Sequence, residues 1–322
     1  MANRPGEDDL IAQFFAPMAA PEGLGLLDDA AVLTPPAGAD LVVTTDAIVA
    51  GVHFFADDPP AAVARKALRV NLSDLAAKGA EPLGFLLALA LPGDWTADWL
   101  VAFAQGLGED AAAYRCPLFG GDTVKTPGPL MVSITTLGRV ESGRMVARTG
   151  VRQGDMLYVS GTIGDAALGL KARLGLLPFL AAEPRNFLLD RYLLPRPRLA
   201  LAPVLARFAH GGMDVSDGFV GDLTKMLRVS GASARVELAK LPLSAAADAA
   251  IAGDPALFEI AATGGDDYEI LAAVAPEQAS AFEAAAAGAG VAVTQVGQAL
   301  VGARAPQFLG RDGAVAAFER GA

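Results

Sequence analysis

The sequence predicts a two-domain α/β protein, and three observations support this fold class. The chain has 322 residues, which is too long for one ordinary hydrophobic core. Apolar residues make up 53% of the sequence and charged residues 19%, a balance typical of globular rather than disordered chains. Apolar runs of strand length alternate with helical patterns along the chain, and this alternation favours layers of helices packed on sheets.

The first half of the chain is predicted to be a sheet with accompanying helices. Residues 7–16 carry a helical apolar pattern, and residues 41–46 are a β-rich run that ends in an aspartate. Residues 60–79 are predicted to form one helix, because proline opens the segment and glycine closes it. Asn71 and Asp74 are three positions apart and therefore share a face of that helix. Further elements are a strand at 84–92, a helix at 96–113, a strand at 117–123 that breaks into a Gly-Gly turn, and a strand at 130–140.

A domain boundary is predicted near residues 139–150, where turn-forming residues gather. It separates an N-terminal domain, residues 1–140, from a C-terminal domain, residues 141–322. The second half has the same α/β style, interrupted by a connection rich in proline and arginine at residues 193–203. Its predicted elements include strands at 155–161 and 234–241 and helices at 164–175 and 219–231.

The charge balance excludes several classes of partner. Lys plus Arg number 25 against 36 Asp plus Glu, a net charge of -11, which argues against nucleic acid or an anionic membrane. A phosphate ligand stays possible, because a bound metal inverts the local field. Cys116 is the only cysteine, so no intrachain disulfide can form. We expect a small buried side chain there and a reducing, cytoplasmic setting.

Six aspartates next to apolar runs are the most informative feature of the chain. A carboxylate beside a buried strand is costly unless a cation meets it, and several converging carboxylates repel one another. Divalent metal is the usual remedy, and hard oxygen ligands suit Mg²⁺, which proteins commonly share with substrate phosphates. The pattern therefore predicts metal-dependent phosphoryl transfer. The six residues are Asp29, Asp46, Asp74, Asp122, Asp214 and Asp217.

Other motifs carry little weight one at a time. The glycines of GGDT, residues 120–123, let backbone amides approach an anion, but Gly-Gly-Asp is also an ordinary turn, as in the later GGDD. Neither a Walker A pattern nor a kinase glycine-rich loop is present. Ser216 lacks the context of a nucleophile and suits a phosphate contact better. Taken alone, His53 and Arg148 are ordinarily structural or solvated residues, and His210 is expected at a helix C-terminus.

The joint occurrence of these motifs is far more specific than any one of them. DDAAVL, TTDAIVAGVHF, KALRVNLSDLAAKGAEP, GGDT, RTGVRQGD, VSGTIGDAALGL, DVSDG and TGGDDYE follow one another along the chain. In this order they resemble the thiamine-monophosphate kinase family, within the aminoimidazole ribonucleotide synthetase superfamily. The resemblance runs from Glu7 to about Asp312, and VNLSDLAAKGA and VAGVHF are its most specific parts.

The resemblance implies a fold, a reaction and a set of site residues. It implies a homodimer of two-domain α/β subunits, with the N-terminal domain forming the dimer. It implies transfer of the γ-phosphate of ATP to thiamine monophosphate, giving thiamine diphosphate, with a cluster of several Mg²⁺ ions. Carried over by motif, the six aspartates with Thr44 and Thr45 bind metal, Gly121, Asp122, Arg148 and Ser216 contact ATP, and His53, Asp266 and Phe318 contact the substrate.

Three positions depart from the family pattern. Leu27 stands where the family usually has glycine, so the backbone near Asp29 is expected to differ. Asp266 replaces a usual glutamate and shortens that side chain by one methylene. The chain ends in FERGA, where Phe318 takes the place of the family's terminal aromatic residue.

Physical chemistry favours the same function and leaves two rivals. Donor and acceptor are both phosphates, so positioning and charge neutralisation matter more than covalent chemistry. We therefore expect direct in-line transfer without a phosphorylated residue. One rival is another ATP-using member of the superfamily, such as an aminoimidazole ribonucleotide synthetase-like ligase. The other is a non-catalytic divalent-metal-binding protein, against which the absence of an EF-hand loop counts.

Overall fold

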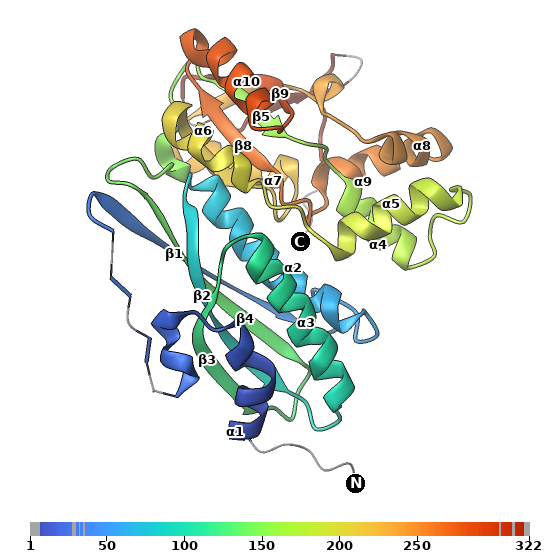
Figure 1. Ribbon diagram of the computed structural model, residues 1–322. Helices are drawn as coiled ribbons and strands as arrows, with labels where there is room; N and C mark the ends of the chain where they lie inside the picture. Colours follow the sequence, from blue (N-terminus) through green and yellow to red (C-terminus); the bar gives the residue numbers. More distant parts are fainter. Residues whose placement is uncertain are drawn as a thin grey trace. The chain divides into compact units, whose positions relative to one another are not determined.

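The computed structural model describes residues 7–27, 30–31, 33–34, 36–302, 304–310 and 313–318. The chain forms two compact units, and Figure 1 shows them coloured along the sequence. The first unit comprises Met1–Leu75 and Glu81–Gly143, and the second comprises Ala76–Ala80 and Arg144–Ala322. Both are mixed α/β, as the sequence predicts. In the described part of the chain, no helix combines the length and the apolar character needed to cross a membrane.

A four-stranded sheet forms the first unit, with strand order β1-β4-β2-β3. Neighbouring strands pair antiparallel, except that β2 and β3 run parallel. Helices α2 and α3 follow β1 and β2 in the chain and lie along one face of the sheet (Figure 1). The bounds are β1 Ala39–Val49, α2 Pro60–Ala77, β2 Glu81–Leu91, α3 Ala97–Ala113, β3 Leu118–Lys125 and β4 Met131–Glu141.

The helices cover only one face of this sheet, as the side chains of β1 show. Val42 and Ile48 are buried, whereas Val43 is 61% exposed, because successive side chains of a strand point to opposite faces. On the covered side, α2 buries Leu68 and Leu72, four residues apart on the apolar stripe of an amphipathic helix. Among the described residues, no helix covers the other face, which still carries exposed apolar side chains such as Val43.

The N-terminal segment is less regular than its sequence pattern predicts. Helix α1 spans only Glu7–Leu10, and a π-helical turn, Ile11–Phe15, continues it. Pro17 follows in a 3₁₀ turn and lacks the N–H group that a continuing helix needs. The helical pattern of residues 7–16 is therefore present as an α-helical turn followed by a π-helical turn, and Phe14 is buried as the apolar pattern requires.

The second unit is built on a six-stranded sheet with order β10-β7-β9-β5-β8-β6. Helix α7 packs on one face, and α6 and α10 pack on the other. The alternation of β5 shows this, because Leu157 and Val159 belong to the core with α7, whereas Tyr158 packs with Phe282 of α10. The strands are β5 Met156–Ser160, β6 Ala209–Asp214, β7 Ser233–Glu237, β8 Ile270–Val274, β9 Val293–Leu300 and β10 Gln307–Leu309, and the helices are α6 Ala202–Phe208, α7 Phe219–Val229 and α10 Ala279–Gly288.

Four more helices form a separate apolar cluster within this unit. Leu168 of α4 and Leu188 of α5 are fully buried against Ala247 of α8 and Ala261 of α9. The α4–α5 contact is so close that a Cβ on Gly169 would overlap the backbone carbonyl of Leu188. This packing fixes the N-terminal end of α4. The bounds are α4 Asp165–Arg173, α5 Ala182–Leu193, α8 Ala245–Gly253 and α9 Leu257–Thr263.

Two local predictions are wrong for identifiable reasons. Residues 120–122 do not leave the strand in a turn, because they lie inside β3 and pair with β2. Gly121 is required there by a close approach of backbones, since a Cβ would overlap the main chain of Leu87. His210 lies in β6 rather than at a helix C-terminus, because pairing of β6 with β8 already begins at Ala209.

Candidate active site

The first unit brings together three predicted metal ligands, Thr44, Asp46 and Asp74. Asp46 lies inside β1 rather than at its end, because the strand continues to Val49. Oγ1 of Thr44 donates to Oδ2 of Asp74 on α2 at 2.5 Å. The amide of Asp46 donates to Oδ1 of Asn71, on the same helix, at 3.0 Å. Two polar side chains of α2 therefore meet the strand at one place, as their three-residue spacing predicts.

The two carboxylates of this group repel each other. Burial raises the pKa of Asp46 above its ordinary value, Asp74 raises it further, and His53 acts in the opposite direction. Adjacent carboxylates in such surroundings favour a divalent cation, and oxygen donors suit Mg²⁺. Within the described ranges, no three His, Cys, Asp or Glu side chains converge as a complete metal site. The pair is therefore one part of any ligand set.

Thr45 presents its hydroxyl on the opposite face of the sheet from Thr44. Its Oγ1 donates to the carbonyl of Ile134 at 3.2 Å and accepts from Oγ1 of Thr135 at 3.0 Å. Both partners belong to β4, and successive residues of a strand point to opposite faces. The structure thus separates the hydroxyls of two threonines that the resemblance assigns to metal together.

His53 lies in the turn that follows β1. Its Nδ1 accepts the amide of Val49 at 3.1 Å, and its carbonyl accepts from Nζ of Lys66 at 3.0 Å. With Nδ1 engaged by this amide, Nε2 is the ring nitrogen left to meet a ligand. The turn is tied to both β1 and α2, the elements that carry Asp46 and Asp74.

Gly121 and Asp122 line a cavity of about 290 Å³ beside β3. Phe15 from the N-terminal segment and Ala30 form part of its wall. Ala30 directly follows Asp29, the predicted ligand that lies outside the described residues. The cavity therefore joins the GGDT motif to the beginning of the DDAAVL motif.

Asp122 lies far from Asp46 within one sheet. The residue row in register across β1, β4, β2 and β3 is Asp46, Ile134, Leu87 and Gly121. Three steps between strands of about 4.8 Å give a separation of about 14 Å. Oxygen ligands lie only about 2 Å from Mg²⁺. One ion therefore cannot bridge Asp46 and Asp122 of the same subunit.

In the second unit, the turn between β6 and α7 forms around one buried carboxylate. Oδ2 of Asp222 accepts three consecutive backbone amides at 2.8–3.1 Å, those of Ser216, Asp217 and Gly218. Burial raises the pKa of Asp222, and these amides and Lys225 oppose that effect. Lys225 also contacts Asp217, so it bridges the two carboxylates. Asp222 thereby fixes the conformation of the turn that carries Ser216 and Asp217.

A second motif lies alongside this turn. The amide of Asp266 donates to the carbonyl of Ser216 at 2.9 Å, and the amide of Tyr268 donates to the carbonyl of Val215 at 2.8 Å. Gly218 permits the approach, because its φ is +115° and a Cβ there would overlap the backbone of Thr263. The structure thus places the DVSDG and GGDD motifs side by side.

Three more predicted residues lie at different places around α7. Asp214 ends β6 and is buried. Arg148 begins a 3₁₀ turn, and its carbonyl accepts from Oγ of Ser230 beyond the C-terminal end of α7. The backbone of Arg148 and the DVSDG turn therefore lie at opposite ends of this helix. Phe318 packs edge-on against Phe308 with ring centroids 5.7 Å apart, in the core that also contains α7.

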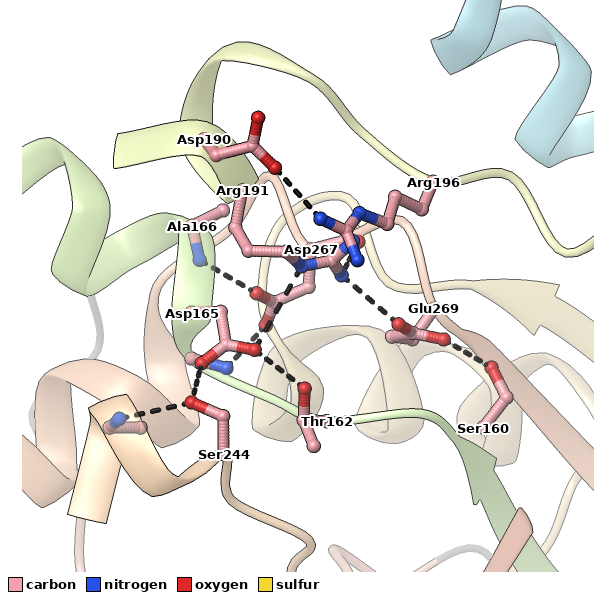
Figure 2. Close-up of polar contacts among 12 residues, drawn as sticks. Ser160, Thr162, Asp165, Ala166, Asp190, Arg191, Arg196, Ser244, Asp267 and Glu269 are labelled. Atoms are coloured by element: carbon pink, nitrogen blue, oxygen red, sulfur yellow. Dashed lines mark hydrogen bonds and ion pairs between the residues drawn. The ribbon is translucent and has the colours of Figure 1, made fainter. Parts of the chain in front are cut away.

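Sequence reasoning missed the polar residues that hold these motifs in place. Asp222 had only a weak signal, an acidic residue in the first turn of a predicted helix. A larger buried group lies under the GGDD segment, and no local pattern marks it. Figure 2 shows these members of the group, which are Ser160, Thr162, Asp165, Arg191, Ser244, Asp267 and Glu269.

Known sequences show which proteins this chain is similar to. Residues 27–140 match AIR synthase related protein, N-terminal domain, and residues 152–305 match AIR synthase related protein, C-terminal domain. The thiamine-monophosphate kinase of Caulobacter vibrioides is 46% identical over 303 residues, covering 92% of this chain and 85% of that protein. The thiamine-monophosphate kinase of Escherichia coli K12 is 40% identical, covering 91% and 90%.

Solved structures agree with the sequences. Thiamine-monophosphate kinase from Stenotrophomonas maltophilia K279a gives a TM-score of 0.81 at 37% identity, covering 90% of this chain and 91% of that chain. AaThiL complexed with AMPPCP and TMP gives 0.78 at 30% identity, covering 90% and 88%. The hydrogenase maturation protein HypE shares the fold, with a TM-score of 0.79 at only 19% identity. This chain therefore belongs to the thiamine-monophosphate kinase family of AIR synthase related proteins.

Proposed function

We infer that this chain transfers the γ-phosphate of ATP to thiamine monophosphate, giving thiamine diphosphate and ADP. The observation that carries this conclusion is family membership along nearly the whole chain, with 46% identity over 92% of its length to one thiamine-monophosphate kinase. A structure at 30% identity holds AMPPCP and TMP together, the pair of ligands that this reaction requires.

The acidic residues are assigned to Mg²⁺ binding. Asp46 and Asp74 fit this role because they are adjacent and because burial and the Asp74 carboxylate raise the pKa of Asp46, which a bound cation would counteract. Mg²⁺ held there would neutralise the phosphates and reduce the repulsion between donor and acceptor. The other residues assigned to metal are Asp29, Thr44, Thr45, Asp122, Asp214 and Asp217.

The remaining assignments divide between nucleotide and substrate. An arginine suits phosphate because it donates two parallel N–H groups, and a carboxylate suits the cationic thiazolium ring. His53 can present Nε2 to a ligand, because its Nδ1 is already engaged by the amide of Val49. The nucleotide phosphates are assigned to Gly121, Asp122, Arg148 and Ser216, and the thiamine moiety to His53, Asp266 and Phe318.

Direct transfer is supported by the state of the alternative nucleophiles. Cys116 is buried, and burial raises the pKa of its thiol to about 12, so it does not form the reactive thiolate at neutral pH. Both ring nitrogens of His210 are engaged, Nδ1 by Asp155 at 2.9 Å and Nε2 by Arg152 at 3.0 Å. A covalent route needs an activated nucleophile, and neither residue supplies one.

Two assays test the reaction and its course. Incubation with ATP, Mg²⁺ and thiamine monophosphate should yield thiamine diphosphate by chromatography. Absence of that product would favour a ligase-like relative or a metal-binding protein. ATP made chiral at the γ-phosphorus should transfer with inversion. Retention, or ³²P left on the protein after ATP alone, would contradict direct transfer.

The open face of the first unit supports a homodimer. Val43, Leu86 and Met131 are exposed on β1, β2 and β4, and β1 and β3 form the two edges of the sheet. A second copy that pairs its β3 edge with this β1 edge, and its β1 edge with this β3 edge, would close the two sheets around the apolar face. The Asp122 of the second copy would then lie near Asp46 of the first. The Asp122 of the same subunit is about 14 Å from Asp46.

Mixed dimers test this arrangement. Asp46→Asn and Asp122→Asn should each be nearly inactive alone. A heterodimer of the two variants, isolated with two different tags, should regain about half the wild-type activity, because one of its two shared sites is intact. No recovery would show that both residues act within one subunit. A monomer mass by light scattering across the working concentrations would contradict the dimer itself.

A further inference from the structure

The segment that carries the proposed substrate residue is anchored by its odd-numbered side chains. Along residues 264–269, Asp267 and Glu269 are 1% and 0% exposed. Asp266 and Tyr268 are instead paired with each other, because Oη of Tyr268 donates to Oδ1 of Asp266 at 3.4 Å. Asp266 is only half-buried, so its carboxylate is the acidic group of this segment that a ligand can reach, whereas Asp267 and Glu269 are enclosed by the protein.

Asp267 anchors the segment to helix α4. Its Oδ2 accepts the amide of Gly164 at 2.6 Å, and its Oδ1 accepts the amide of Ala166 at 3.0 Å. The first amides of a helix have no partner within the helix. Asp267 therefore caps α4 from a distant part of the chain, and Figure 2 shows its carboxylate at the start of that helix.

Glu269 anchors the segment to two arginines and a serine. Its Oε2 accepts from Oγ of Ser160 at 2.6 Å and from Nε of Arg198 at 2.7 Å. Its Oε1 accepts from Nη2 of Arg191 at 3.1 Å and also contacts Nη2 of Arg198. Arg198 thus grips both carboxylate oxygens, the geometry that only arginine provides. It comes from the Pro/Arg-rich connection at residues 193–203, which the proposed function leaves without a role.

Arg191 links the two anchors. Its side chain is 3% exposed, and its Nη2 lies 3.4 Å from the carbonyl of Asp267 as well as 3.1 Å from Glu269. Its Nε lies 3.8 Å from Oδ2 of Asp165. Displacement of any one of these groups therefore disturbs the next.

The backbone explains why such anchors are needed. Asp266 has a φ of +73° and Tyr268 a φ of +51°. The left-handed conformation costs a non-glycine residue about 1–2 kcal/mol, and it persists only where the surroundings hold it. Hydrogen bonds to Val215 and Ser216 hold one side of the segment, and the buried charges hold the other.

A role in stability alone would not require this chemistry. A buried ion pair contributes little net stability, because the cost of removing charges from water offsets their attraction. Apolar side chains would fill the same space. Charged groups with fixed directions add positional precision, and the precision here falls on the residue directly before the first anchor, Asp266.

We propose that Glu269, Arg198, Arg191 and Asp267 are positioning residues that hold the carboxylate of Asp266 in place to bind the thiamine moiety of the substrate. This inference rests on the proposed function. It gives the Pro/Arg-rich connection a purpose, which is to bring Arg198 to Glu269 across 71 positions of the chain.

Steady-state kinetics of single and double variants test the proposal. Glu269→Gln keeps the shape of the side chain and removes its charge, and it should raise KM for thiamine monophosphate about tenfold, the effect of weakening a buried charge-assisted hydrogen bond. The KM for ATP should stay within about twofold of wild type. Arg198→Lys keeps the charge but cannot grip both oxygens, and it should raise the same KM by a smaller factor. Asp266→Ala should raise it at least as much as Glu269→Gln.

The double variants separate positioning from direct contact. In an Asp266→Ala background, neither Glu269→Gln nor Arg198→Lys should raise the KM for thiamine monophosphate further, because both act through Asp266. Effects that multiply would overturn the proposal. Glu283→Gln is the matched control, since it removes a charge that accepts from Oη of Tyr158 in the same unit. It should leave both KM values unchanged.

The outcomes distinguish this proposal from the function it rests on. If Asp266→Ala raises the KM for thiamine monophosphate while Glu269→Gln and Arg198→Lys do not, the network is not a positioning device, and the substrate assignment stands. If Asp266→Ala has no effect in an enzyme that forms thiamine diphosphate, the assignment of Asp266 fails and the proposal fails with it. If Glu269→Gln does not fold, Arg198→Lys decides alone.

Discussion

The two units of this protein surround their acidic residues in opposite ways. In the first unit, Asp46 lies beside Asp74, and this second carboxylate raises the pKa of the first. In the second unit, Asp267 is met by two backbone amides and Glu269 by two arginines and a serine. The carboxylates of Asp46 and Asp74 repel each other, whereas those of Asp267 and Glu269 are surrounded by hydrogen-bond donors.

This difference separates metal ligands from positioning residues on physical grounds. A carboxylate whose oxygens already accept several hydrogen bonds has little capacity left for a cation. Two carboxylates that repel each other gain from one. Asp222 is intermediate, because it accepts three amides and pairs with Lys225 but is also repelled by the neighbouring carboxylate of Asp217. The contrast predicts which substitutions abolish turnover and which only displace a motif.

The largest expected effect is at the repelling pair. Asp46→Asn and Asp74→Asn should each nearly abolish turnover and leave the fold intact. Loss of metal-held charge neutralisation costs several kcal/mol of barrier, and ~1.4 kcal/mol is already tenfold in rate. Turnover at saturating Mg²⁺, with circular dichroism as the check on folding, measures this. Near-normal turnover in both variants would remove the metal assignment.

Asp110 provides a matched control for this prediction. It is buried in α3 and pairs through both oxygens with Arg69, at 2.5 and 2.9 Å. Asp110→Asn should lower Tm, because it weakens a buried ion pair, and should leave the Mg²⁺ dependence of turnover unchanged. A loss of turnover equal to that of Asp46→Asn would mean that a general loss of stability, not loss of metal, is the common cause.

A smaller effect is expected at the intermediate residue. Asp222→Asn keeps one oxygen for the amides of Ser216, Asp217 and Gly218 but removes the negative charge that strengthens these bonds, so the turn should loosen. We expect kcat/KM for ATP to fall about tenfold and the free energy of unfolding to fall by about 1–3 kcal/mol. Lys225→Met keeps the acceptor and should have the weaker effect. The reverse order of the two variants would show that the lysine, rather than the carboxylate, holds the turn.

The sequence predicts best where a local pattern determines the structure. The helices expected at 60–79 and 96–113 are present as α2 and α3. The spacing of Asn71 and Asp74 correctly places both side chains against β1, because helical periodicity needs no knowledge of the rest of the fold. The mixed α/β class follows from the same periodicities.

The sequence predicts poorly where distant segments decide. The sequence predicts a turn at Gly121. The structure shows instead that the close backbone of β2 requires a glycine there. The link from Arg198 to Glu269 crosses 71 positions, and that from Gly164 to Asp267 crosses 103. An arginine beside prolines looks solvated in the sequence. Only the tertiary fold shows that it meets a buried carboxylate.

The buried carboxyl group of Asp267 should make the stability of the protein depend on pH. Burial raises the pKa of Asp267 to about 8 from an ordinary 3.8, against the opposing effect of the amides of Gly164 and Ala166. Between these pH values the folded protein holds a proton that the unfolded chain has lost. Stability should therefore fall as pH rises through this range, by at most about 1.4 kcal/mol per pH unit, and level off above about 8.

Comparison with Asp267→Asn isolates this group, because asparagine does not titrate. The difference in the free energy of unfolding between wild type and Asp267→Asn, measured by urea from pH 5 to about pH 9, should decrease steadily with pH. A difference that is flat across the range would show that Asp267 is ionised throughout, held by its two amides.

The smallest expected effect concerns the length of the side chain at Asp266. Asp266→Glu adds one methylene and restores the side chain usual in the family, so the KM for thiamine monophosphate should fall or stay unchanged. The backbone sets a limit, however, because φ is +73° here and aspartate tolerates the left-handed region better than glutamate does. We expect a loss of stability of up to about 1 kcal/mol, visible as a lower Tm. A raised KM with an unchanged Tm would reverse both expectations. It would mean that the anchors hold the carboxylate at the distance that aspartate requires, and that the shorter side chain is the fitted one.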